Sequence, residues 1–149
     1  MEYVTRVPDN AIGRAALMHL REFGLDVSHV VYGGDRLGSY FFEPAAAMRN
    51  SMVVYDRANS SFFTLKHGDI DWQPIFQNAM LFHCSGITCA MSKDALDTTF
   101  DALETAKSMG VEITCDINYR ANLWHYEGAN AAKTIHKLME YSSFIFGDQ

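Results

Sequence analysis

The sequence predicts an α/β fold in which a mostly parallel sheet is flanked by helices. From residue 71 onward, apolar runs of strand length alternate with longer stretches whose apolar residues recur at helical spacing. Gly24 and Gly110 end two of the helical stretches, as glycine commonly does. Strands that alternate with helices form right-handed βαβ units and hence a parallel sheet. The chain has 149 residues, 48% of them hydrophobic, which is enough for one domain with a buried core.

The N-terminal segment predicts a strand followed by a helix. Residues 3–6 have the pattern of the end of a strand, and residues 8–10 supply a turn and a helix cap. Residues 11–23 then carry apolar side chains at helical spacing.

Residues 28–63 predict an excursion of short strands from the main sheet. The strands expected at 29–32, 38–42 and 51–57 are separated by turn signals such as Gly33-Gly34-Asp35. A small sheet cannot bury both of its faces by itself, so one face should cover a ligand site or another subunit.

The rest of the chain predicts alternating helices and strands. We expect a parallel sheet of about four strands, with one strand at each of Tyr3, Met80, Val111 and Phe144. Such a sheet leaves edges that a complete fold covers, so we expect residues 1–149 to be a single partial domain. The expected elements are a helix at 72–79 entered at Asp71, a strand at 80–85, a helix from Ser92 to Met109, a strand at 111–116, a helix at 129–141 and a strand at 144–146.

The charge balance argues against nucleic acid as a partner. The net charge is −6, and no cluster of Lys and Arg occurs. The first residues lack the regions of a signal peptide, and no apolar run is long enough to cross a membrane. We therefore expect a cytoplasmic protein that binds small polar ligands and neither nucleic acid nor membrane.

The cysteines and histidines indicate structural roles. Cys84, Cys89 and Cys115 match no zinc-binding spacing, and small apolar side chains suit a buried sheet. The six histidines are scattered, and His83 fits a hydrogen-bonded sheet residue better than a ligand. We expect no metal site formed by these residues.

Polar side chains gather just after the strand expected at 111–116. Asp116, Asn118 and Arg120 follow its carboxyl end, where ligands bind in open α/β sheets. A second interpretation fits the same residues without a ligand. In it, Asp116 caps a turn, Asn118 takes a left-handed conformation and Arg120 is a solvated charge.

A second group of candidate residues lies on the excursion. Tyr55 and Arg57 share one face of the strand at 51–57, and Tyr40 on a neighbouring strand can lie beside them. An arginine fork binds a carboxylate through two hydrogen bonds, and a tyrosine hydroxyl adds another. With Arg120 as a further cation, these residues favour a site for a small anion. An exposed Tyr/Arg ladder on a surface sheet would show the same pattern.

Five collinear stretches carry a resemblance to a known family. The sharpest are Asp-Asn-x-x-Gly-Arg at 9–14 and Asp-x-Asn-x-Arg at 116–120, and the others lie at 24–30, 55–60 and 82–88. In this order they resemble the ribokinase-like (PfkB) sugar kinases, and among them the 2-keto-3-deoxygluconate kinases. The resemblance covers nearly the whole chain and implies a partial ribokinase-like fold.

The resemblance also implies roles for individual residues in binding the sugar. Residues 28–63 would supply a small β-lid over the sugar site. Tyr55 and Arg57 would bind the sugar acid, Tyr40 would be a further lid contact, and Ile87 would form part of an apolar wall.

On the nucleotide side, the resemblance places Asn118, Tyr119 and Arg120 where phosphate donor and sugar meet, with Arg120 also facing the sugar. ATP and magnesium are the implied cofactors. Lid strands in this family often pair between subunits, so the resemblance also implies a homo-oligomer formed through the β-lid.

Two family motifs do not occur in this chain, a Gly-Gly near the N-terminus and a Gly-Ala-Gly-Asp near the C-terminus. The second carries the catalytic base and the anion hole, so we expect no catalytic residue within 1–149 and little or no activity from the isolated chain. The family's magnesium motif Asn-x-x-Glu is replaced by Gly147-Asp148-Gln149.

We expect the complete protein to phosphorylate a 2-keto-3-deoxy sugar acid with ATP. Two alternatives remain open. One is an inactive fragment or truncated paralogue that associates through its lid. The other is a kinase for a neutral sugar such as fructose or ribose.

Overall fold

The computed structural model describes residues 1–147, which fall into two compact units, Met1–Leu65 and Lys66–Gln149. Each unit is described by itself. Asp148 and Gln149, on which the expectation about the family's magnesium motif falls, lie outside the described residues.

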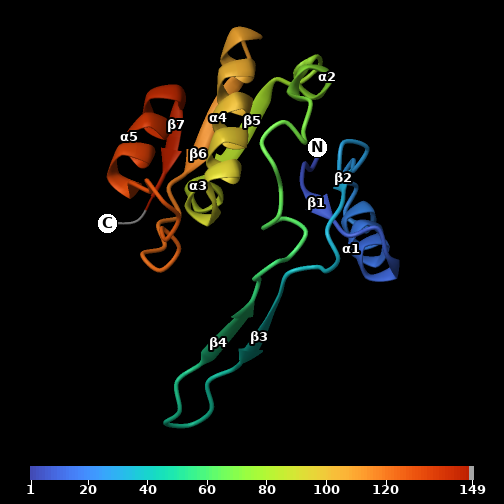
Figure 1. Ribbon diagram of the computed structural model, residues 1–149, viewed down its shortest axis with the longest axis vertical. Helices are drawn as coiled ribbons and strands as arrows, with labels where there is room; N and C mark the ends of the chain where they lie inside the picture. The colour runs from blue at the N-terminus through green and yellow to red at the C-terminus, as the bar shows by residue number, and fades with distance from the viewer. Residues whose placement is uncertain (148–149) are drawn as a thin grey trace. The chain divides into compact units, whose positions relative to one another are not determined.

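The first unit begins with two short parallel strands and one helix. Strand β1 (Arg6–Val7) pairs with β2 (Val31–Tyr32), and α1 (Ala11–Glu22) lies between them in the chain (Figure 1). Their core is formed by buried apolar side chains, with Leu20 and Leu37 packed against it. The buried members of this core are Val7, Leu17, Val27 and Val30.

The start of α1 explains the glycine in the motif at 9–14. The Asn10 side chain caps the helix by accepting hydrogen bonds from the backbone N–H groups of Ile12 and Gly13, both at 3.0 Å. A Cβ on Gly13 would lie 2.0 Å from the carbonyl oxygen of Pro8. Only glycine therefore lets the helix begin so close to the preceding turn.

A long antiparallel hairpin completes the first unit. Strands β3 (Ser39–Glu43) and β4 (Met52–Asp56) run side by side (Figure 1), with Ser39 opposite Asp56 and Glu43 opposite Met52. The large apolar side chains of both strands are exposed on both faces of this hairpin.

The second unit is a piece of the predicted parallel sheet together with its helices. Strands β5, β6 and β7 are all parallel and hydrogen bonded in that order. Helices α4 and α5 pack against β6 (Figure 1). The elements are α2 (Trp72–Phe76), β5 (Leu81–Ser85), α3 (Gly86–Met91), α4 (Lys93–Ser108), β6 (Glu112–Asp116), α5 (Ala131–Tyr141) and β7 (Phe144–Phe146).

The predicted α/β class and most of the predicted elements are confirmed. The Ser92 hydroxyl caps α4 by accepting a hydrogen bond from the Ala95 N–H at 3.1 Å. Gly110, with φ of +73°, follows the end of the same helix, in the left-handed region that favours glycine. Cys84, Ile113 and Cys115 lie on the buried face of the sheet.

Three expectations about strands and helices were wrong. No helix was expected between the strand at 80–85 and Ser92, but Gly86 begins α3 immediately after Ser85. That short apolar helix has no polar face by which its sequence could be distinguished from a strand. The first strand forms at Arg6–Val7 and pairs with β2 rather than joining β5, β6 and β7 in a four-stranded sheet. Consequently β2 belongs with β1 and not with the hairpin strands.

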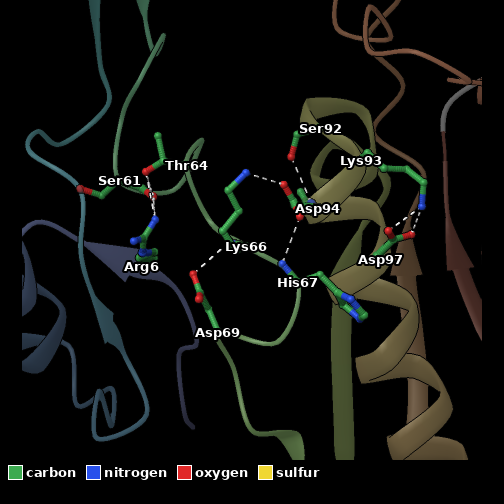
Figure 2. A network of polar contacts seen from close by, with 11 residues as sticks. Arg6, Ser61, Thr64, Lys66, His67, Asp69, Ser92, Lys93, Asp94 and Asp97 are labelled. Carbon is green, nitrogen blue, oxygen red and sulfur yellow. Dashed lines mark hydrogen bonds and ion pairs between the residues drawn. The ribbon is translucent and has the colours of Figure 1, made fainter.

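Polar side chains hold the segments on each side of the unit boundary within their own units (Figure 2). In the first unit, the Arg6 Nη1 donates to the carbonyl oxygen of Ser61 at 3.2 Å and to the Thr64 hydroxyl at 3.0 Å. In the second unit, Asp94 near the start of α4 accepts hydrogen bonds from the Lys66 ammonium at 2.9 Å and the His67 N–H at 3.3 Å.

Candidate functional site

Tyr40, Tyr55 and Arg57 form a cluster on one face of the hairpin. Tyr40 on β3 is the register partner of Tyr55 on β4, so both side chains leave the hairpin on the same side. Their ring centroids lie 6.3 Å apart. The Arg57 Cζ lies over the Tyr55 ring, 4.1 Å from its centroid. The structure therefore brings together the three residues that the alternation of the strands predicted to be neighbours.

The environment of Arg57 differs from that of the other arginines on the hairpin. Arg36 pairs with the carboxylate of Asp56, and Arg49 pairs with Glu43 at 2.8 Å. Arg57 instead rests on an aromatic face, where the negative face of the ring attracts the cation. Within residues 1–147, no carboxylate forms an ion pair with this half-buried guanidinium. Its N–H groups can therefore bind an external anion.

A second group of candidates lies at the carboxyl ends of β5 and β6. Ser85 and Asp116 are register partners at these two strand ends. The Asn118 side-chain amide donates a hydrogen bond to the Ser85 hydroxyl at 3.2 Å, and its backbone N–H donates to Asp116 Oδ1 at 3.1 Å. Asn118 has a φ of +38°, in the left-handed region. The turn thus holds the Asn118 amide at the edge of the sheet where ligands of open α/β folds bind.

Ser85 is a member of this group that the sequence did not single out. The only signal for it was its position at the end of an apolar strand, level with Asp116. Its hydroxyl fixes the orientation of the Asn118 amide, because it accepts from the Nδ2 atom.

Gly86 and Ile87 link this turn to α3. A Cβ on Gly86 would lie 2.4 Å from the carbonyl oxygen of Ile117, so the turn packs directly on the backbone of the helix. Ile87 follows in the first turn of α3 and is half-buried. The predicted apolar wall residue is thus within the same unit as Asn118.

Tyr119 and Arg120 are exposed at the end of the turn. The Arg120 Nη1 donates to the Tyr119 carbonyl oxygen at 2.9 Å. Arg57 belongs to the first unit and Arg120 to the second. Their convergence on one sugar acid stays a prediction.

The three thiols are buried and are free cysteines. A hydrogen bond with Cys115, together with burial, raises the pKa of Cys84, its neighbour across the strands. Burial raises the pKa of Cys89 to about 12. Protonated, buried thiols are weak nucleophiles and poor metal ligands, which agrees with the structural role expected for Cys84 and Cys89.

His83 forms the side-chain hydrogen bond that its strand position suggested. Its Nδ1 lies 2.9 Å from the Thr114 hydroxyl on β6. Among residues 1–147, no three His, Cys, Asp or Glu side chains gather as a metal site. Within the same residues, no helix is both long and apolar enough to span a bilayer.

The fold and these motifs define the class of protein. The family model described as "pfkB family carbohydrate kinase" matches residues 1–149. The chain therefore belongs to the pfkB family of carbohydrate kinases. The predicted resemblance to this family is confirmed.

Several relatives that the chain resembles are enzymes named for keto-deoxy sugar acids. It is similar to the crystal structure of 2-dehydro-3-deoxygluconokinase from Thermotoga maritima, with 42% identity and a TM-score of 0.90 over 98% of this chain and 44% of that one. The 2-dehydro-3-deoxygalactonokinase of Haloferax volcanii is 34% identical over 87% of this chain and 41% of its own length. The 2-dehydro-3-deoxygluconokinase of Bacillus subtilis is 27% identical over 98% of this chain and 45% of its own length.

The chain therefore spans less than half the length of these relatives. A fructokinase from Xylella fastidiosa with bound ATP has a TM-score of 0.81 at 18% identity, which shows that the fold is shared.

Proposed function

We propose that the full-length protein is an ATP-dependent kinase of a 2-keto-3-deoxy sugar acid, and that this chain supplies its lid and part of its substrate site. The cluster of Tyr40, Tyr55 and Arg57 carries this proposal. A guanidinium over an aromatic ring retains N–H donors that bind a carboxylate as a fork. The adjacent tyrosine hydroxyls are suited to the hydroxyl groups of the sugar. The names of the relatives, which denote 2-dehydro-3-deoxy sugar acids, support the same substrate class.

The turn after β6 is our proposed contact with the nucleotide and the reacting end of the sugar. The Asn118 amide is oriented by Ser85, and the exposed Arg120 can pair with a phosphate or with the acid group. Tyr119 would lie beside them at the nucleotide. Magnesium is commonly bound by substrate phosphates with few protein ligands, so we propose that it enters with the nucleotide.

Catalysis itself would depend on residues absent from residues 1–149. The proposed chemistry is attack of the terminal hydroxyl of the sugar on the γ-phosphate, which needs a base to accept the hydroxyl proton. The Gly-Ala-Gly-Asp motif that provides this base in the resembling family does not occur in the sequence. We expect the isolated chain to be inactive.

A coupled kinase assay on the full-length protein tests this proposal. We expect ATP consumption with 2-keto-3-deoxygluconate and much less with fructose or ribose at equal concentration. Arg57→Ala should raise the KM for the acid sugar by about 10- to 100-fold and leave the KM for ATP unchanged. That factor corresponds to the free energy of a hydrogen bond to a charged group. Equal turnover of neutral sugars, or equal changes in both KM values, would refute the acid substrate.

The opposite face of the hairpin favours a second role, in association between copies of the chain. Phe41, Met52 and Val54 are exposed by 65%, 54% and 50%, and Phe41 and Val54 are register partners. We propose that two copies pair these faces to form a homo-oligomer through the lid, whether or not the chain is catalytic. Light scattering should show a dimer that Phe41→Lys converts to monomer. A monomeric wild type at micromolar concentration would exclude this role.

A further inference from the structure

Arg36 connects the two legs of the hairpin at its base. Its Nη1 donates to the carbonyl oxygen of Ala58 at 2.9 Å, and its Nη2 donates to the carbonyl oxygen of Asp56 at 3.0 Å. The same Nη2 also pairs with the Asp56 carboxylate. These acceptors lie on either side of Arg57 in the chain. One guanidinium thus fixes the backbone that carries Arg57 to the strand that leads to Tyr40.

The backbone of Arg36 is itself attached to the packed part of the first unit. Its carbonyl oxygen accepts hydrogen bonds from the Ser61 N–H at 2.8 Å and from the Ser61 hydroxyl at 2.9 Å. Ser61 is only 1% exposed. The two legs also approach closely at this level, because a Cβ on Gly38 would lie 3.3 Å from the Ser60 side chain.

The hairpin needs such a constraint for two physical reasons. Two-stranded hairpins are marginally stable by themselves, and the exposed faces of this one gain little from burial. In addition, the tight turn seen in the hairpin, where Ala46 and Arg49 exchange backbone hydrogen bonds, lies at its far end and does not fix the base that carries Arg57. A slip of one residue would move Tyr55 to the opposite face, away from Tyr40.

We propose that Arg36 is a positioning residue for substrate binding, which holds the register and the base of the hairpin so that Tyr40, Tyr55 and Arg57 share one face. This inference rests on the proposed sugar-acid function. Arg36 itself would not contact the sugar. It acts through the Asp56 and Ala58 carbonyl groups that flank Arg57.

Two measurements on the full-length protein test the role of Arg36. The first is amide hydrogen exchange, which needs no kinase activity. Arg36→Ala should speed exchange of the β3 and β4 amides at least about tenfold and leave α4 amides unchanged, because only the hairpin is loosened. The second is steady-state kinetics. Arg36→Ala should raise the KM for the acid sugar about tenfold with kcat changed less than about threefold.

Matched variants separate this role from a general loss of charge. Arg36→Lys retains the charge but lacks the fork that reaches two carbonyl groups, so its KM should lie between those of wild type and Arg36→Ala. Arg49→Ala removes an arginine from the far end of the same hairpin, where it pairs with Glu43 alone. It should leave exchange of the hairpin base and the KM unchanged.

The possible outcomes distinguish failure of this inference from failure of the proposed function. Unchanged hairpin exchange in Arg36→Ala, or an unchanged KM while Arg57→Ala raises it, would overturn the role of Arg36. If the wild type does not turn over the acid sugar, the proposed function fails. The exchange measurement then still decides whether Arg36 holds the hairpin. Without acid-sugar binding, however, the role of Arg36 in positioning the substrate is overturned.

Discussion

Replacing Gly86 with alanine should displace the turn that carries Asn118. The added Cβ would lie 2.4 Å from the Ile117 carbonyl oxygen, whereas ordinary contacts begin near 3.4 Å. The carbonyl must therefore move by about 1 Å, because the added Cβ meets backbone atoms and no flexible side chain can move aside. We expect a loss of about 1–3 kcal/mol in the free energy of unfolding, which is typical of overpacking.

The same displacement should also lower kcat/KM, and by more than the loss of stability alone would explain. A misplacement of about 1 Å can reduce kcat/KM by about 100-fold. The assay combines denaturant unfolding with the coupled kinase assay on the full-length protein. Gly110→Ala is the matched control, because no atom lies within 4 Å of its added Cβ. Its φ of +73° should cost about 1 kcal/mol of stability without moving the turn.

Equal losses of kcat/KM in Gly86→Ala and Gly110→Ala would contradict this role of Gly86. Wild-type stability and wild-type kcat/KM in Gly86→Ala would contradict it as well. Either result would show that α3 does not hold the Asn118 turn in place.

On α5, Leu138 is 1% exposed and its neighbour Met139 is 43% exposed. Leu138→Ala should lower the free energy of unfolding by about 2–5 kcal/mol, and Met139→Ala by much less; similar losses in denaturant unfolding would contradict the packing described above. The hydrogen bond from Lys66 holds the pKa of Asp94 below its usual range. The stability that Asp94 adds should therefore be present above about pH 4 and be lost as the pH falls below it. The unfolding curves of wild type and Asp94→Asn should then converge in acid. A difference in stability that persists at about pH 2 would argue against this ion pair. Since burial raises the pKa of Cys89 to about 12, the native thiol should resist alkylation at about pH 8 and react once the protein unfolds, as mass spectrometry can show; rapid labelling of the native protein would mean that the site opens readily.

The sequence by itself determined the class of the fold and much of the hairpin cluster. Helices end at Gly24 and Gly110 because glycine tolerates positive φ, and Ser92 begins α4 because its hydroxyl caps free N–H groups. The strand period of two placed Tyr55 and Arg57 on one face, a rule that holds for any paired strand. These features depend on neighbours in the chain, so local physical chemistry suffices to predict them.

Contacts between distant residues were decided by the tertiary structure alone. Nothing in the local pattern indicated that β1 would pair with β2, or that Ser85 would orient Asn118 across 33 positions of sequence. The bonds from Arg36 to the Asp56 and Ala58 carbonyl groups depend in the same way on the register of β3 and β4. Register and side-chain partners come from the packing of the whole unit, because many pairings satisfy the same local periodicity and only one also buries the core.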